Sequence, residues 1–288
     1  MYKFIAFVSV LFLCSCAQEI EIDQPFYQPK IVVDGVIESG APALVYLTMS
    51  SPFLNEYDSV SIRNSFLNYA KVTVSCSNGD SEVLMLTYKS DFFPPFVYRS
   101  NHLKGIVGEE YTLKVEVGNR VVTAVTTIPR PPEVLDFAQH EVADTACYYQ
   151  LEMAAHDTVQ YLYVQMKSIV ADNNMHPASI PFYKLMPAVS PTNVVVYRSD
   201  ETNLYLESRS NYFYSGWPSG VFSLQDSVIV KVGTVDVVSY QILKSLYADQ
   251  SMLKNPFAFN SAGIQTNVVG GIGRWMGVGL APTRFWPN

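Results

Sequence analysis

The sequence has few of the residues that build catalytic and metal sites. It contains four cysteines and four histidines among 288 residues, and His102, His140, His156 and His176 lie in separate segments. No H-E-x-x-H or C-x-x-C pattern occurs, so the common zinc motifs are missing. No G-x-S-x-G sequence occurs either, which argues against a hydrolase nucleophile of that type. We therefore expect no metal, no cofactor and no catalytic residue, and interpret the protein as a non-enzyme.

Basic residues and long apolar runs are also scarce. Lys and Arg number 19 against 26 Asp and Glu, for a formal net charge of -7. With no basic stripe to pair with phosphates, a nucleic-acid partner is not expected. Beyond residue 13, no stretch is apolar and long enough to span a bilayer as a helix.

The N-terminus is organised differently from the rest of the chain. Lys3 precedes an apolar run of ten residues that leads to Leu13-Cys14-Ser15-Cys16, the layout of a secretory signal. Small or aliphatic residues before a cysteine are typical of lipoprotein cleavage. We expect a signal peptide over 1–15, a lipid anchor at Cys16 and a tether over 16–29. An ordinary signal peptide with incidental cysteines is the alternative.

Two cysteines remain beyond this motif, Cys76 and Cys147, far apart in sequence. They would form a disulfide in an oxidising compartment, or act as two small buried apolar side chains. The second interpretation is favoured because lone cysteines are commonly buried.

From Lys30 the chain shows short alternating strands separated by turn residues, as at Asn78-Gly79. This pattern predicts an immunoglobulin- or fibronectin-like β-sandwich over residues 30–130. Its expected strands are 31–37, 44–49, 71–76, 82–88, 111–117 and 120–128.

The segment Pro129-Arg130-Pro131-Pro132 marks a domain boundary, because proline removes backbone donors and favours extended chain. A second β-rich domain is expected over 131–288. Apolar residues at helical spacing, preceded by Asp236 as an N-cap, predict one amphipathic helix at 237–253. The predicted fold class is therefore mostly β, with two domains and one helix. Strands of the second domain are expected at 148–153, 159–169, 194–197, 203–209, 221–224 and 228–232.

Three polar or glycine-rich segments resemble ligand loops but fit turns better. Asp172-Asn173-Asn174 lacks the glycine and the final carboxylate of a calcium loop and predicts a hairpin turn. Glu109-Glu110 follows a glycine and predicts exposed turn charges. The run Gly270 to Gly277 places Met276 where a dinucleotide loop has its third glycine, so it predicts tight turning of the backbone beneath Trp275.

Two aromatic clusters are the candidate contact sites. Both lie in turn-rich segments, where large rings form a ligand platform or a protein contact, or else fill the core or cover a sheet edge. Exposure decides between these interpretations. The clusters comprise Tyr212, Phe213, Tyr214 and Trp217, and Phe92, Phe93 and Phe96.

A set of short motifs, in order along the chain, is similar to the outer-membrane lipoprotein family known as domain of unknown function forty-two forty-nine. The motifs are the lipobox with its following acidic residues, residues 29–38, Ser50-Ser51-Pro52-Phe53, residues 108–113, Thr126-Thr127-Ile128-Pro129, and Asn255-Pro256-Phe257 leading to 267–273. The resemblance implies an outer-membrane, cell-surface lipoprotein encoded beside a TonB-dependent transporter. It supplies no agreed catalytic or binding residues.

Together these observations predict a non-catalytic accessory that captures substrate for such a transporter in nutrient uptake. A surface adhesin or glycan-binding module using the cluster from Tyr212 to Trp217 is the first alternative. A hydrolase with carboxylates drawn from dispersed strands is the second.

Overall fold

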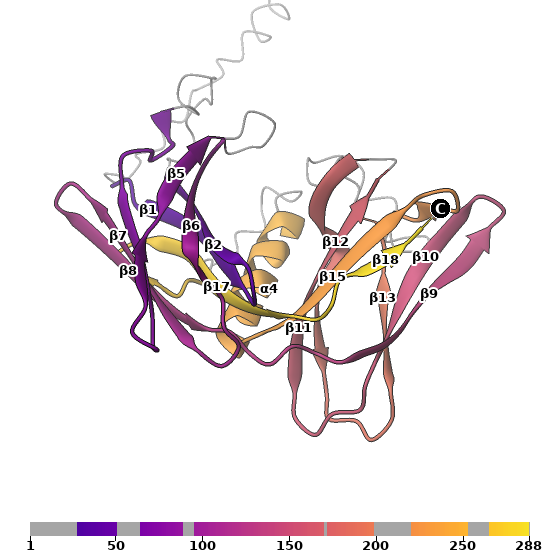
Figure 1. Cartoon of the computed structure of the whole chain (residues 1–288). Coiled ribbons are helices and arrows are strands. Elements are labelled where there is room, and N and C mark those ends of the chain that lie inside the picture. Colours follow the sequence, from indigo (N-terminus) through magenta and orange to yellow (C-terminus); the bar gives the residue numbers. More distant parts are fainter. Residues whose placement is uncertain are drawn as a thin grey trace, which may run out of the picture.

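The computed structural model describes residues 28–50, 64–88, 95–169, 172–198, 220–252 and 265–287. It has two β-sandwich units side by side and one long helix, α4, between them (Figure 1). The predicted mostly-β fold class is confirmed, and within the described ranges the one long helix is the predicted one. Cys16 and the strand expected at 203–209 lie outside the described residues.

The first sandwich packs a five-stranded sheet against one half of a nine-stranded sheet. Inward-facing residues alternate with outward-facing ones along its strands, as in Lys71–Cys76, so each strand buries one face in a shared core. The five-stranded sheet has the order β16 (Val268–Val269), β8 (Arg120–Thr127), β7 (Glu110–Val117), β3 (Lys71–Cys76) and β4 (Ser81–Val83), and the opposing strands are β1 (Ile31–Glu38), β2 (Pro42–Met49), β6 (Phe96–Lys104) and β5 (Met85–Tyr88).

The second sandwich is built in the same way from the other half of the nine-stranded sheet and a four-stranded sheet. The segment Asp172-Asn173-Asn174, expected as a hairpin turn, instead begins the second strand of a hairpin, because Ser168 pairs with Asp172. Strands of the larger sheet are β12 (Asp172–Leu185), β11 (Gln160–Ser168), β15 (Val228–Val235) and β18 (Arg284–Trp286), and the smaller sheet holds β9 (Val134–Ala143), β10 (Ala146–Met153), β13 (Thr192–Val196) and β14 (Phe222–Ser223).

Strand β17 (Ile272–Leu280) joins the two halves of the nine-stranded sheet. It runs parallel to β1 over Val32–Glu38 and pairs with β15 at Gly279 and Leu280. Figure 1 shows it as the yellow strand between the units. Residues 268–269 and 272–278, which the sequence places in the second domain at 131–288, thus pair with strands of the first sandwich.

The tight turning of the backbone that was expected beneath Trp275 was wrong, because Trp275 lies within a strand. The turn occupies only residues 270–271, and β17 follows at once. Gly277 is required by close approach, because a Cβ there would lie 2.4 Å from the carbonyl oxygen of Thr127. The glycines therefore let a strand pass close to its neighbours, and no helix follows that would complete a dinucleotide loop.

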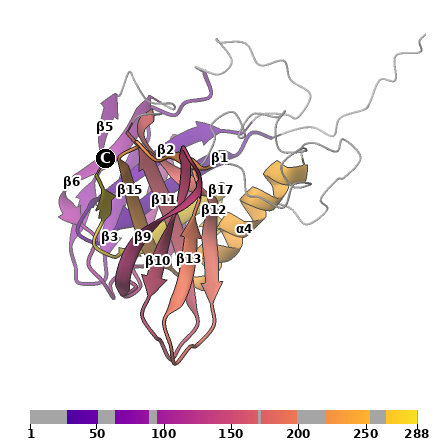
Figure 2. The same cartoon turned by 90° about the vertical axis from the view of Figure 1, so that its right-hand side faces the viewer.

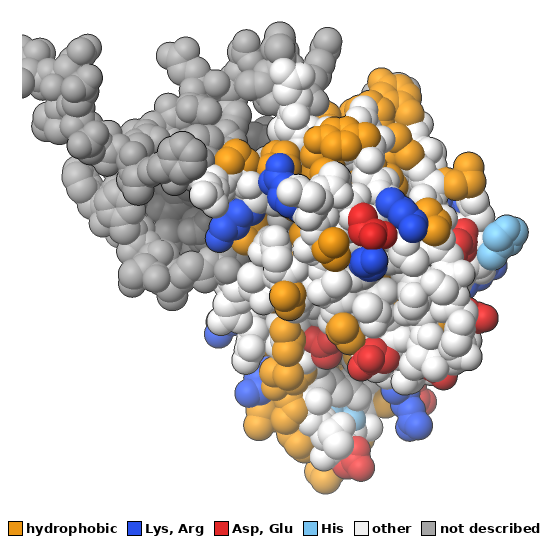
Figure 3. All heavy atoms as spheres, turned by 90° about the vertical axis from the view of Figure 1, so that its left-hand side faces the viewer, with side chains coloured by type: hydrophobic (Ala, Val, Ile, Leu, Met, Phe, Trp, Pro, Cys, Tyr) orange, Lys and Arg blue, Asp and Glu red, His pale blue; other side chains and the backbone are white. Residues whose placement is uncertain are grey.

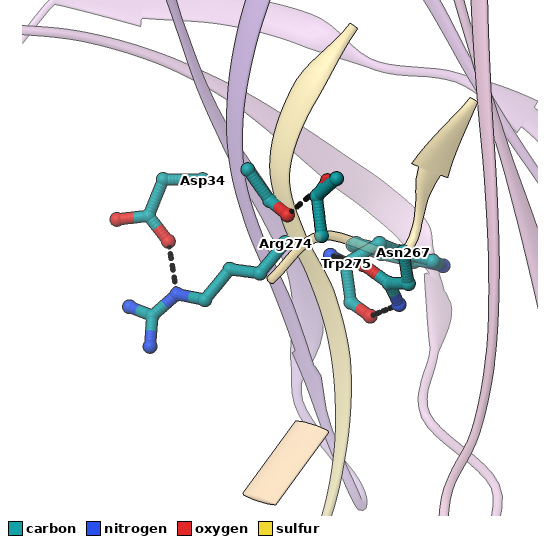
Figure 4. A network of polar contacts seen from close by, with 6 residues as sticks. Asp34, Asn267, Arg274 and Trp275 are labelled. Carbon is teal, nitrogen blue, oxygen red and sulfur yellow. Dashed lines mark hydrogen bonds and ion pairs between the residues drawn. The ribbon is translucent and has the colours of Figure 1, made fainter. Parts of the chain in front are cut away.

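Trp275 holds β17 in the first sandwich. Its side chain is fully buried, and its indole Nε1 donates to the carbonyl of Tyr111 at 2.9 Å. The side-chain amide of Asn267 accepts from the Trp275 backbone N–H at 3.0 Å and donates to its carbonyl at 2.7 Å. On the other face of the sheet, Arg274 Nε lies 2.6 Å from Asp34 Oδ1 (Figure 4).

Helix α4 (Val237–Met252) matches the predicted helix to within one residue. Asp236 caps it as expected, since Ser239 N donates to Asp236 Oδ1 at 2.6 Å. The helix contacts β17, β11 and β12 on the sheet face that turns away from both sandwich cores (Figure 2). Its Leu243 is buried against Met276 and other residues of that face.

Candidate functional site

The structure describes only part of the predicted aromatic clusters. Tyr212, Phe213, Tyr214, Trp217, Phe92 and Phe93 lie outside the described residues, so their role stays a prediction. Phe96 is described and begins β6.

Phe96 belongs to a row of rings that runs from the core to the surface. Its ring centroid lies 6.1 Å from that of Phe66, which is buried, and 5.4 Å from that of Tyr88. The side chain of Tyr88 is 64% exposed, and Leu86, two residues earlier on the same face, is 39% exposed. We call Leu86, Tyr88 and Phe96 the aromatic edge. Phe96 itself is half-buried, so it supports the exposed ring of Tyr88.

Leu86 and Tyr88 of the aromatic edge lie on β5, the last strand of the nine-stranded sheet, and Phe96 lies on the neighbouring β6. The chain passes from β4, at the edge of one sheet, to β5, at the edge of the other, through the buried Leu84. Edge strands are usually protected by charged residues or proline. The β5 sequence Met85-Leu86-Thr87-Tyr88 has neither, and exposed apolar surface of this kind commonly marks an interaction site.

The base of the aromatic edge is fixed and uncharged at neutral pH. Tyr98 pairs with Leu86 across the strands, and its hydroxyl donates to the carbonyl of Leu67 at 3.0 Å and accepts from Ala70 N at 2.9 Å. Burial raises the pKa of Tyr98, the nearby Tyr69 adds to this, and the Ala70 N–H opposes it. The site thus offers apolar and aromatic contact rather than acid–base chemistry.

A second candidate site lies in the second sandwich, where the sequence gave no signal. A hollow of about 520 Å³ opens between strands β9 and β18. The two strands lie at the edges of their sheets and are bridged by Arg284, whose Nη2 donates to the carbonyl of Val134 at 2.6 Å. The lining residues are Leu135, Asp136, Phe137, Arg284, Phe285, Trp286 and Pro287. We call this the β9–β18 hollow.

Aromatic rings form one side of the β9–β18 hollow. Phe137 and Trp286 pack edge to face with their centroids 6.0 Å apart, and both lie against Tyr149. Tyr149 is buried, which raises the pKa of its hydroxyl and keeps it neutral. Phe285 alternates with Trp286 along β18 and is 55% exposed. Trp286 is therefore packed against the core, whereas Phe285 points to the opposite face of β18.

The remaining candidates for chemistry have structural roles. Cys76 and Cys147 are free and buried, as favoured from the sequence, and burial raises the pKa of the Cys147 thiol. Glu110 is exposed as expected, whereas Glu109 is half-buried and its carboxylate accepts from the Ser77 hydroxyl. Within the described ranges, no three His, Cys, Asp or Glu residues are grouped so that they could hold a metal ion.

The outer surface of the first sandwich carries no single dominant charge. Figure 3 shows this side, with hydrophobic side chains in patches among acidic and basic ones. Val121, Val125 and Val269 are exposed apolar residues on neighbouring strands of the five-stranded sheet. No helix in the described part of the chain has the length and apolar character to cross a membrane.

The chain matches a family model described as "Domain of unknown function (DUF4249)" over residues 17–279. This match confirms the resemblance found in the sequence motifs. A solved structure titled "Cytokine receptor complex - Crystal form 1A" aligns with 9% identity over 88% of this chain and 95% of that chain, at a TM-score of 0.26. That score does not establish a common fold. No curated protein matches the sequence.

Proposed function

We propose that this chain, which belongs to the DUF4249 family, is an outer-membrane lipoprotein that serves as a non-catalytic accessory to a TonB-dependent transporter in nutrient uptake. The lipid anchor is assigned to Cys16 from the lipobox. An anchored protein stays at the membrane surface without a membrane-spanning segment of its own, since each buried acyl methylene contributes about 0.8 kcal/mol.

The observation that carries the partner role is the aromatic edge. Its exposed Tyr88 and Leu86 lie on an uncharged strand that pairs, within the described ranges, with β6 alone, so it offers side-chain contacts and an edge to a partner. The edge is in the first sandwich, whose strand β1 begins at Ile31, soon after the tether. A short tether places this unit close to the membrane and to any transporter in it.

The lipid tether would act by raising the local concentration of substrate at the transporter. A domain held beside the transporter mouth raises the local concentration of captured substrate without any chemical step.

The test is co-purification from native membranes in mild detergent, through a C-terminal tag, with co-purifying proteins identified by mass spectrometry. Wild type should recover a large β-barrel transporter, and Cys16→Ala should recover much less. The double variant Leu86→Ser, Tyr88→Ser should keep its membrane location but lose at least 80% of the transporter. Phe285→Ser, at an exposed ring in the other unit, is the matched control and should recover as much as wild type.

Recovery of the lipoprotein alone, with uptake unchanged in a deletion strain, would refute the accessory role. Equal recovery by wild type and the double variant would refute docking through the aromatic edge. The adhesin or glycan-binding alternative that uses Tyr212 to Trp217 stays a prediction, because those residues lie outside the described ranges.

A further inference from the structure

The outer edge of the nine-stranded sheet, formed by β5 and the end of β6, is protected at one end by a carboxylate. The backbone N–H groups of Asn101, His102 and Leu103 donate to Glu82 at 2.7, 3.0 and 2.7 Å. Burial raises the pKa of Glu82, but these hydrogen bonds and the nearby His102 side chain outweigh it and lower the pKa below its ordinary value. Glu82 is therefore ionised at neutral pH and occupies these donors of β6.

Strand β5, next along this edge, has no such protection within the described ranges. It pairs with β6 from Met85 opposite Arg99 to Tyr88 opposite Phe96, and with no other described strand. In an antiparallel pair, every second residue of a strand directs its N–H and C=O away from its neighbour. No described side chain or strand bonds to these backbone groups of β5. Among the described residues they are thus left to a strand added from outside.

Both faces of β5 offer apolar contacts to such a strand. Leu86 and Tyr88 share one face with the ring of Phe96. Met85, which is 58% exposed, lies with Thr87 on the opposite face. Neither face carries a charged side chain or a proline of β5, which are the usual devices that keep a foreign strand away.

The geometry favours an extended occupant over a helical one. A helix satisfies its own backbone groups, so it would leave the N–H and C=O groups of β5 without partners. An extended segment pairs with them and places successive side chains on the two faces in turn. Its residues beside β5 should be uncharged and apolar, to match Met85, Leu86 and Tyr88, and should include no proline, which lacks the N–H donor.

We propose that β5 accepts an extended, uncharged segment of the transporter as an added strand of the nine-stranded sheet. This docking mode rests on the proposed accessory function, because the segment belongs to the docked transporter. Backbone pairing along β5 fixes the segment in one register and places its side chains on both faces. Docking through the side chains of Leu86 and Tyr88 alone would need only one face.

Site-specific photo-crosslinking of the full-length lipoprotein in native membranes tests the docking mode. A benzophenone amino acid replaces Met85, Leu86, Thr87 or Tyr88 in turn, and crosslinked transporter peptides are identified by mass spectrometry. Each position should crosslink to the same segment, and the site of attachment should move along it by about one residue for each step along β5. Val121, a comparably exposed apolar residue on β8, is the control position and should give no transporter crosslink.

A charge on the face opposite the rings separates the two docking modes. Thr87→Lys leaves Leu86 and Tyr88 unchanged but puts a charged side chain on the edge strand. It should lower transporter co-purification at least fivefold. Thr123→Lys, at an outward, half-buried position of β8, is the matched control and should recover as much transporter as wild type.

Crosslinks from Leu86 and Tyr88 alone, or wild-type recovery by Thr87→Lys, would overturn strand addition and leave the accessory function standing. Attachment at helical spacing in the transporter, or to β5 of a second copy, would overturn strand addition as well. Failure of the wild type to recover any transporter would instead refute the accessory function, and strand addition with it.

Discussion

Replacing Asn267 by alanine should selectively destabilise the first sandwich. The Asn267 side chain makes hydrogen bonds to both backbone groups of Trp275, at 3.0 and 2.7 Å, and to the carbonyl of Val125 at 3.3 Å. Each such bond contributes about 1 kcal/mol, and a buried group left without a partner costs about 1–3 kcal/mol. Because Trp275 is fully buried, we expect Asn267→Ala to lower the free energy of unfolding by about 2–4 kcal/mol.

Urea unfolding followed by tryptophan fluorescence measures this change, since Trp275 leaves its buried site when the first sandwich unfolds. Asn267→Asp should cost a similar amount at neutral pH, because a carboxylate accepts from the Trp275 N–H but cannot donate to either carbonyl. Asn193→Ala, at an exposed position on β13, is the control and should stay within about 0.5 kcal/mol of wild type. A cost below about 1 kcal/mol for Asn267→Ala would show that Asn267 does not hold β17 in place.

Two further predictions concern close packing and pH. Gly277→Ala should cost about 3 kcal/mol or more in urea unfolding, because its Cβ would meet the Thr127 carbonyl oxygen at 2.4 Å. Gly118→Ala, at an open turn with φ of +59°, should cost only about 1–2 kcal/mol, and equal costs would contradict the close approach. Burial, assisted by nearby Tyr197, raises the pKa of Tyr183 from 10.0 to about 12. Between these two pKa values the folded state therefore keeps a proton that the unfolded state releases. The contribution of Tyr183 to the free energy of unfolding is complete below pH 10 and falls as pH rises from 10 towards 12, by at most about 1.4 kcal/mol per pH unit. Unfolding midpoints between pH 9 and 11.5 should fall less steeply in Tyr183→Phe than in wild type, and identical slopes would refute this contribution.

Strands with strict alternation and clear turns could be predicted from the sequence. Residues 71–76 and 111–117 match β3 and β7 closely, because one face of each strand is buried and the other is exposed. The helix could also be predicted, because Asp236 and the apolar spacing from Val238 mark its start. These elements are specified by local pattern.

Strands whose burial depends on distant partners could not be predicted. In β9 the residues Ala138, Gln139 and His140 are all half-buried in succession, so the alternation is lost. In β17 the glycines and Trp275 resemble a turn, and only the parallel pairing with β1, far away in sequence, makes them a strand. Parallel pairing of this kind leaves no short-range signal.

The two candidate sites also differ in how far the sequence could predict them. Phe96 was identified because aromatic residues cluster around it in sequence, but its exposed partner Tyr88 was seen only as part of a strand. The β9–β18 hollow combines Asp136 and Phe137 with Phe285 and Trp286, about 150 residues apart in the chain. No local motif could have revealed it, because its strands meet only at the edges of two different sheets.

The two sites are related through the shared sheet. The junction between β15 and β17 consists of two residue pairs, Gly233 with Leu280 and Thr234 with Gly279. It is reinforced by an ion pair between Lys231 Nζ and Glu38 Oε2 at 3.0 Å, which links β15 to β1, and by α4, which contacts both β11 and β17. Motion between the units must break these contacts together, which favours a fixed distance between the aromatic edge and the β9–β18 hollow.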